Sequence, residues 1–180
     1  MKVIVIYGTE CDENTAWLPW LKKKLFDNNI SCEVPHFPTP KNQSFENWSK
    51  VLNSYEIKSD DILVGWSTGA IFAVRYLFEN NLNIKKLLLI SGFNNYLNKT
   101  YPTIDSINKD FFMKDESVAK NVAKSIVCFK SNNDPFISQT ALNTFAKNLG
   151  AKLITIENGG HFNAAAGYTS FFKLYDEIKK

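Results

Sequence analysis

The chain has 180 residues, of which 44% are hydrophobic and 22% charged, and its formal net charge is +3. This composition is ordinary for a globular protein, and the length suits one domain, which we expect to span residues 1–180. The lysines are scattered, which argues against a nucleic-acid-binding surface. No apolar run approaches the roughly 20 residues that a membrane-spanning helix needs.

Apolar runs of strand length alternate with longer amphipathic segments along the chain. This alternation predicts an α/β protein, a three-layer sandwich of about six parallel strands with helices on both faces of the sheet. In chain order, we expect a strand at 2–7, a helix at 15–28, a strand at 30–35, a helix at 44–55, a strand at 61–65, a helix at 68–80, a strand at 86–91, a helix at 115–123, a strand at 125–130, a helix at 137–149, a strand at 152–156 and a helix at 165–178.

Residues 91–114 form the one long segment for which we predict no regular structure. Loops of this length are often functional. Two roles stay open for it, a wall of a substrate pocket or a packed surface loop.

The sequence Gly65-Trp66-Ser67-Thr68-Gly69 lies between the third predicted strand and the third predicted helix. A Gly-x-Ser-x-Gly at such a position is typical of the nucleophile elbow of α/β-hydrolases, where a tight turn holds the serine hydroxyl above the sheet. We expect side chains at Gly65 and Gly69 to collide with their neighbours. Ser67 is therefore the predicted nucleophile.

A serine nucleophile needs a base and an acid, and in this fold they follow it in the chain, each after a strand. Only two histidines are present: His161 follows the last predicted strand, whereas His36 precedes the serine among prolines. Asp134 is the only carboxylate in the loop after the strand at 125–130. We predict a triad of Ser67, Asp134 and His161, in which the histidine takes and returns the serine proton and the aspartate fixes the imidazole tautomer.

Two alternatives stay open for the acid. Some hydrolases take it from one strand earlier, which would nominate Asp105 or Asp110. Asp134 is also followed by Pro135, and aspartate and proline are common in turns and helix caps that have no chemical role.

Acyl transfer also needs N–H donors for the oxyanion of the tetrahedral intermediate. In this architecture one donor is the backbone N–H after the nucleophile, here Thr68, and the other comes from the loop after the first strand. Thr9, which follows Gly8 in that loop, is the expected second donor. Cys11 lies in the same loop, either near the active site or as a partly exposed thiol without a role.

Several short motifs also occur in a specific order along nearly the whole chain. They are Trp17-Leu18-Pro19-Trp20-Leu21, Phe45-Glu46-Asn47-Trp48, the Gly65–Gly69 elbow, Ser91-Gly92-Phe93, Asn133-Asp134-Pro135, and Gly159-Gly160-His161-Phe162 followed by Gly167-Tyr168. With them the chain resembles the small serine hydrolases that include retinoblastoma-binding protein 9 and its bacterial relatives. The resemblance implies a minimal α/β-hydrolase without a separate cap domain, with Ser67, Asp134 and His161 matching the family triad. The chain differs from many α/β-hydrolases after the first strand, where it has Tyr7-Gly8 in place of His-Gly.

The main functional hypothesis is a cytoplasmic serine hydrolase that cleaves a small ester, with an amide as the alternative substrate, and that uses no metal or cofactor. Three cysteines without paired or metal-like spacing agree with a reducing compartment. A second hypothesis keeps the fold as a non-catalytic protein-interaction module. A nucleotide-binding domain fits less well, because the first strand is not followed by a Gly-x-Gly-x-x-Gly phosphate loop.

Overall fold

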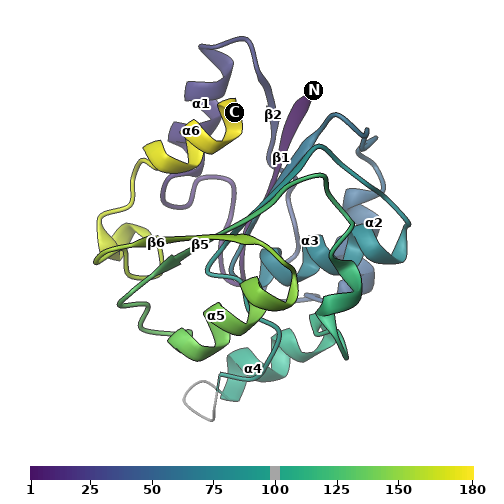
Figure 1. The fold of residues 1–180 in the computed structure, drawn as a ribbon, viewed down its shortest axis with the longest axis vertical. Helices are drawn as coiled ribbons and strands as arrows, with labels where there is room; N and C mark the ends of the chain where they lie inside the picture. The colour runs from purple at the N-terminus through teal and green to yellow at the C-terminus, as the bar shows by residue number, and fades with distance from the viewer. Residues whose placement is uncertain (98–101) are drawn as a thin grey trace.

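The computed structural model of the chain describes residues 1–97 and 102–180, and its centre is one six-stranded sheet (Figure 1). All neighbouring strands are parallel, in the order β2-β1-β3-β4-β5-β6. The central strands are buried and apolar, as expected for a parallel sheet covered on both faces. The strands are β1 (Lys2–Ile6), β2 (Ser31–Glu33), β3 (Ile62–Trp66), β4 (Lys86–Ile90), β5 (Ile126–Ser131) and β6 (Lys152–Ile156).

Helices cover both faces of this sheet, so the predicted three-layer sandwich is confirmed. Figure 1 shows α1 and α6 on one face and α2, α3 and α5 on the other, and no separate cap domain is present among the described residues. This distribution follows from right-handed connections between parallel strands, with β1 in the interior of the sheet. The helices are α1 (Leu18–Phe26), α2 (Phe45–Leu52), α3 (Thr68–Glu79), α4 (Pro102–Asn108), α5 (Gln139–Asn148) and α6 (Phe172–Lys179).

Two tryptophans in the motifs of the first two helical regions, Trp17 and Trp48, are core residues. Trp17 is fully buried on the α1 and α6 face, with its ring 5.7 Å from that of Phe171. Trp48 is fully buried on the opposite face, 5.3 Å from Phe72 in α3. Both motifs therefore stabilise the two helical layers and take no part in the chemistry directly.

Each predicted strand is present, and its ends agree within two residues. The helices differ more. The helix predicted at 15–28 begins only at Leu18, with a proline in its first turn, where the missing N–H costs no hydrogen bond. The one predicted at 115–123 is a single 3₁₀ turn, η2 (Glu116–Ala119). The last prediction, 165–178, divides into the 3₁₀ turn η3 (Ala164–Ala166) and α6, because Gly167 adopts a left-handed conformation that ends the turn.

The prediction of an irregular segment at 91–114 is wrong in part. It contains α4 and the 3₁₀ turn η1 (Lys109–Phe111), while residues 98–101 lie outside the described residues. Three of the seven residues of α4 are β-branched and therefore weak helix formers, so the sequence signal is faint. Tertiary contacts hold the helix: Asp105 accepts the Leu97 N–H at 2.7 Å, and Asn108 is buried.

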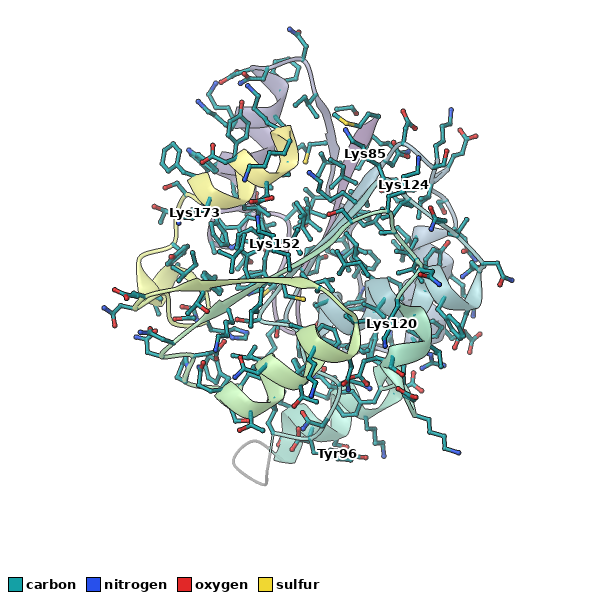
Figure 2. The ribbon with its side chains drawn as sticks, viewed as in Figure 1. Lys85, Tyr96, Lys120, Lys124, Lys152 and Lys173 are labelled. Atoms are coloured by element: carbon teal, nitrogen blue, oxygen red, sulfur yellow. The ribbon has the colours of Figure 1, made fainter. Side chains whose placement is uncertain are left out.

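The surface lysines are spread over several elements. Of those labelled in Figure 2, Lys85 precedes β4, Lys120 and Lys124 precede β5, Lys152 begins β6 and Lys173 lies in α6. Across residues 1–97 and 102–180, no helix is long and apolar enough to cross a membrane.

Candidate active site

Ser67 lies in the tight turn that joins β3 to α3. Its backbone has φ 56° and ψ −123°, a conformation that is strained for a residue with a side chain and typically costs about 1–3 kcal/mol. The Ser67 N–H donates to the carbonyl oxygen of Ile90 at 2.8 Å, which ties the turn to the end of β4. Strain of this size, held by surrounding structure, is characteristic of functional turns.

Glycines allow the backbone around Ser67 to pack closely. A Cβ at Gly69 would collide with the carbonyl oxygen of Ile6, and one at Gly65 would lie 2.7 Å from the Cα of Ala70, as expected from the sequence. Gly8 has a related role that we did not predict, because a Cβ there would lie 2.8 Å from the Ser67 Cβ.

The structure brings the three predicted triad side chains into one hydrogen-bonded row. The Ser67 Oγ lies 3.1 Å from the Nε2 of His161, and the Nδ1 of His161 lies 2.9 Å from the Oδ2 of Asp134. An ionised carboxylate can only accept, so Nδ1 carries a proton, and in the neutral imidazole Nε2 is left to accept from the serine hydroxyl. A serine next to an unprotonated imidazole nitrogen is the arrangement that activates a hydroxyl for nucleophilic attack.

The carboxylate of Asp134 is fully enclosed and bonded at both oxygens. Its Oδ1 accepts the N–H groups of Phe136 and Ile137 at 3.0 and 3.1 Å, and its Oδ2 also accepts the hydroxyl of Ser91 at 2.7 Å. Burial acts to raise the pKa of Asp134, but the hydrogen bonds, together with the positive charge that His161 carries when it is protonated, outweigh it and lower that pKa below its ordinary value. Asp134 is therefore ionised at neutral pH.

The ring and backbone of His161 are held by two aromatic side chains. The indole N–H of Trp66, the residue before the serine, donates to the His161 carbonyl oxygen at 3.0 Å. The ring of Phe136 meets the imidazole edge-on, with 5.0 Å between ring centres. His161 itself is 9% exposed and borders a cavity, so the imidazole does not lie on the open surface.

Two asparagines join the loop of the acid to the loop of the histidine. The Oδ1 of Asn132 accepts the N–H of Asn158, and the Oδ1 of Asn133 accepts the N–H of Gly160, both at 2.8 Å. These bonds fix the spacing between the loops after β5 and β6. The sequence prediction missed both asparagines and Ser91 as supporting residues, although all three adjoin predicted strand ends.

The alternative site residues lie elsewhere. The Oδ1 of Asp105 accepts the N–H of Leu97, and the Oδ2 of Asp110 accepts the N–H of Phe45, both at 2.7 Å. Within the described residues, neither carboxylate bonds to a histidine. The side chain of His36 is 79% exposed on the surface.

The Ser67 and His161 side chains border a cavity of about 390 Å³. Residues of the 91–114 segment form one wall of this cavity. The apolar side chains that line the cavity are Trp66, Phe93, Leu97, Ile104, Phe136 and Ile137.

Thr9 and Thr68 border the same cavity beside the serine. Their side-chain hydroxyls lie 3.1 Å apart, so the loop after β1 is bonded to the first residue of α3. Among residues 1–97 and 102–180, neither backbone N–H has a protein acceptor. Both donors are thus available to a group bound next to Ser67.

Cys11 also borders the cavity, but its thiol is a weak nucleophile. Burial is the main effect that raises the pKa of Cys11 to about 11, so the thiol stays protonated at neutral pH. No group of three or more His, Cys, Asp or Glu residues in the described part of the chain is arranged to hold a metal ion.

Tyr7 stands where many α/β-hydrolases have histidine, and its role is structural. Its hydroxyl accepts the N–H of Phe37 at 2.7 Å and donates to the carbonyl oxygen of the same residue at 3.2 Å. Burial raises the pKa of Tyr7 to about 12. The residue thereby anchors the loop after β2 to the end of β1.

Replacing Ser91 with alanine is expected to raise the pKa of Asp134, because it removes one of the hydrogen bonds that hold the ionised form. A carboxylate whose pKa is lowered by folding stabilises the protein above its unfolded pKa, and this stability is lost as the pH falls through the folded pKa. Ser91→Ala should therefore be less stable at neutral pH and lose the remaining contribution at a higher pH than the wild type. Urea unfolding measured from neutral to acidic pH tests this.

Ser131→Ala is the matched control for that experiment. Ser131 is also fully buried at the end of a strand, but its hydroxyl donates to Asn133 at 2.6 Å and not to Asp134. It should change the overall stability without moving the pH range in which stability is lost. Equal pH profiles for Ser91→Ala and the wild type would show that Ser91 does not hold the acid.

The chain is similar to known serine hydrolases. The model of the family described as Serine hydrolase matches residues 3–180. The chain is 27% identical to the putative hydrolase YdeN of Bacillus subtilis, over 98% of this chain and 94% of that protein. It is 26% identical to the serine hydrolase RBBP9 of Rattus norvegicus, over 91% and 85% of the two chains. The crystal structure of the B. subtilis ydeN gene product superposes with a TM-score of 0.89 at 25% identity, covering 99% and 96% of the two chains.

Proposed function

This chain belongs to the serine hydrolase family, and on that basis we propose that it cleaves a small ester, with amides as the alternative substrates, through an acyl-serine intermediate. One observation carries the proposal: the unbroken row from the Ser67 Oγ to His161 at 3.1 Å and from His161 to Asp134 at 2.9 Å. The row opens on a cavity with room for a small substrate. In this account Ser67, His161 and Asp134 form the catalytic triad.

The proposed reaction begins when the Ser67 Oγ attacks the substrate carbonyl carbon and the Nε2 of His161 takes the hydroxyl proton. The imidazolium then gives this proton to the leaving alcohol or amine as the acyl-serine forms. Water, deprotonated by the same nitrogen, releases the acid in the second half. Asp134 holds the Nδ1–H tautomer and stabilises the imidazolium without becoming protonated.

We assign the stabilisation of the tetrahedral intermediate to the backbone N–H groups of Thr9 and Thr68. The proposal is supported by their position beside Ser67 and by the lack of a protein acceptor for either N–H in the described part of the chain. Loss of one such donor typically costs about 3 kcal/mol of transition-state stabilisation. The hydroxyl–hydroxyl contact between the two threonines keeps the donors at a fixed spacing.

A screen of substrates tests the proposal against a non-catalytic interaction module. p-Nitrophenyl esters of increasing acyl length and aminoacyl amides are assayed with the wild type and with Ser67→Ala. We expect the wild type to hydrolyse esters far faster than Ser67→Ala does, because a cavity of about 390 Å³ beside Ser67 has room for a small substrate. A wild type that hydrolyses neither class any faster than Ser67→Ala does would favour the interaction module.

A further inference from the structure

Asn108 is a buried amide in the mostly apolar wall of the active-site cavity. It is the last residue of α4, is 1% exposed and borders the same cavity as Ser67. Its neighbours along this wall, Leu97 and Ile104, are apolar. A buried polar side chain in such a place needs hydrogen-bond partners for both ends of its amide.

The described partners of Asn108 all contact its amide oxygen. The hydroxyl of Thr39 donates to the Oε1 of Gln43 at 2.5 Å, and the Nε2 at the other end of that side chain is a donor. This Nε2 donates to the Asn108 Oδ1 at 2.9 Å, and the hydroxyl of Thr9 donates to the same oxygen at 2.7 Å. The oxygen of Asn108 is therefore fully used, and its Nδ2 is directed away from this cluster.

The Nδ2 of Asn108 has no acceptor among residues 1–97 and 102–180. In the described part of the chain, two completely buried side-chain atoms lack a hydrogen-bond partner, the Trp17 Nε1 and the Ser49 Oγ. The Asn108 Nδ2 is not one of them, so it is not completely buried. Asn108 borders the cavity but is only 1% exposed, so at most one edge of its amide nitrogen reaches the cavity. One N–H group is thus left for whatever the cavity holds.

The charges around the cavity narrow the class of ligand. None of its described lining residues is a lysine or arginine, and the one carboxylate, Glu10, is exposed. An anionic acyl group would find no cationic partner in such a site. A neutral group that is mostly apolar but carries one hydrogen-bond acceptor matches both the walls and the amide.

We propose that Asn108 is a specificity-determining residue, whose Nδ2 donates to an acceptor oxygen in the acyl part of a neutral substrate. This inference rests on the proposed function, since it assigns the acyl group of that reaction to the wall formed by α4. The Asn108 Oδ1 has a separate task, because it positions Thr9, the proposed oxyanion donor, through the 2.7 Å hydrogen bond.

Three pairs of p-nitrophenyl esters test the assignment: butanoate with methoxyacetate, pentanoate with 3-methoxypropanoate, and hexanoate with 4-methoxybutanoate. In each pair an ether oxygen replaces one methylene group. Dividing each kcat/KM by the alkaline hydrolysis rate constant of the same ester removes the intrinsic difference in reactivity. In the wild type we expect the ether ester of at least one pair to be preferred about fivefold, the usual effect of one neutral hydrogen bond.

Two variants test whether this preference belongs to Asn108. Asn108→Leu removes both ends of the amide, whereas Asn108→Asp keeps an oxygen for Thr9 and Gln43 but replaces the donor by an acceptor. Both variants should lose the preference for the ether ester. The ratio of kcat/KM between the two esters of a pair does not change when an enzyme loses activity toward both esters equally. No preference for an ether ester in the wild type, or a preference that persists in either folded variant, would overturn the inference.

Ser67→Ala, assayed with the same esters, separates this inference from the proposed function. If Ser67→Ala retains the wild-type activity, the proposed function itself is wrong. If Ser67→Ala is inactive but the ether preference is absent or does not depend on residue 108, only the role of Asn108 is wrong.

Discussion

Ser67→Ala is expected to reduce ester turnover about 10⁶-fold while the protein stays folded. The substitution removes the attacking oxygen, whose hydrogen-bond partner is His161, and alanine places no new atom in the turn. It introduces no new backbone strain, because serine already has a positive φ there. The measurement is kcat with a p-nitrophenyl ester, together with the thermal unfolding midpoint of both proteins.

Cys11→Ser is the matched control for Ser67→Ala, because Cys11 is a second nucleophilic side chain on the same cavity. Its half-buried, protonated thiol takes no part in the proposed reaction, so we expect turnover within a few-fold of the wild type. The assignment of the nucleophile fails if Ser67→Ala is folded and keeps activity within tenfold of the wild type, or if Cys11→Ser is the inactive variant.

Asp134→Asn is expected to lower kcat about 10⁴-fold, the second largest effect in this account. The amide keeps the shape of the carboxylate, but it favours the wrong imidazole tautomer and does not stabilise the imidazolium. Four donors converge on this side chain, from His161, Ser91 and the backbone of Phe136 and Ile137, and all of them are matched to a carboxylate. The variant should therefore also be less stable than the wild type at neutral pH.

Asp105→Asn is the matched control for the acid. Asp105 is likewise buried, at 7% exposure, but its carboxylate accepts a backbone N–H in the α4 region and is not bonded to His161. Stability should fall in this variant, with kcat within about tenfold of the wild type. A larger loss of kcat in Asp105→Asn than in Asp134→Asn would place the acid one strand earlier.

The sequence is enough to predict that the three side chains of the candidate site lie together, because of a general property of parallel sheets. The carboxyl ends of their strands meet at one edge, so residues that follow different strands are brought together. Ser67, Asp134 and His161 follow β3, β5 and β6, and their separation in the chain does not affect this outcome. The tight turn is also predictable, since only glycine fits at Gly65 and Gly69.

The supporting contacts of the site were not predictable in the same way. The bonds from Ser91 to Asp134 and from Asn133 to Gly160 depend on side-chain rotamers and on the relative height of neighbouring loops. Neither is encoded in hydrophobic periodicity. The sequence did not predict helix α4, because tertiary packing holds this helix and its intrinsic helix propensity is weak. For the same reason the sequence did not predict that Asn108 lines the cavity.

Peptide mapping after reaction with a fluorophosphonate shows whether Ser67 is the nucleophile activated by His161. We expect one covalent adduct, on the peptide that contains Ser67, with esterase activity lost in proportion to the fraction labelled. His161→Ala should label far more slowly, because its serine hydroxyl lacks the adjacent base. An adduct on Cys11 or another residue, or full activity in protein whose Ser67 is completely labelled, would contradict the account.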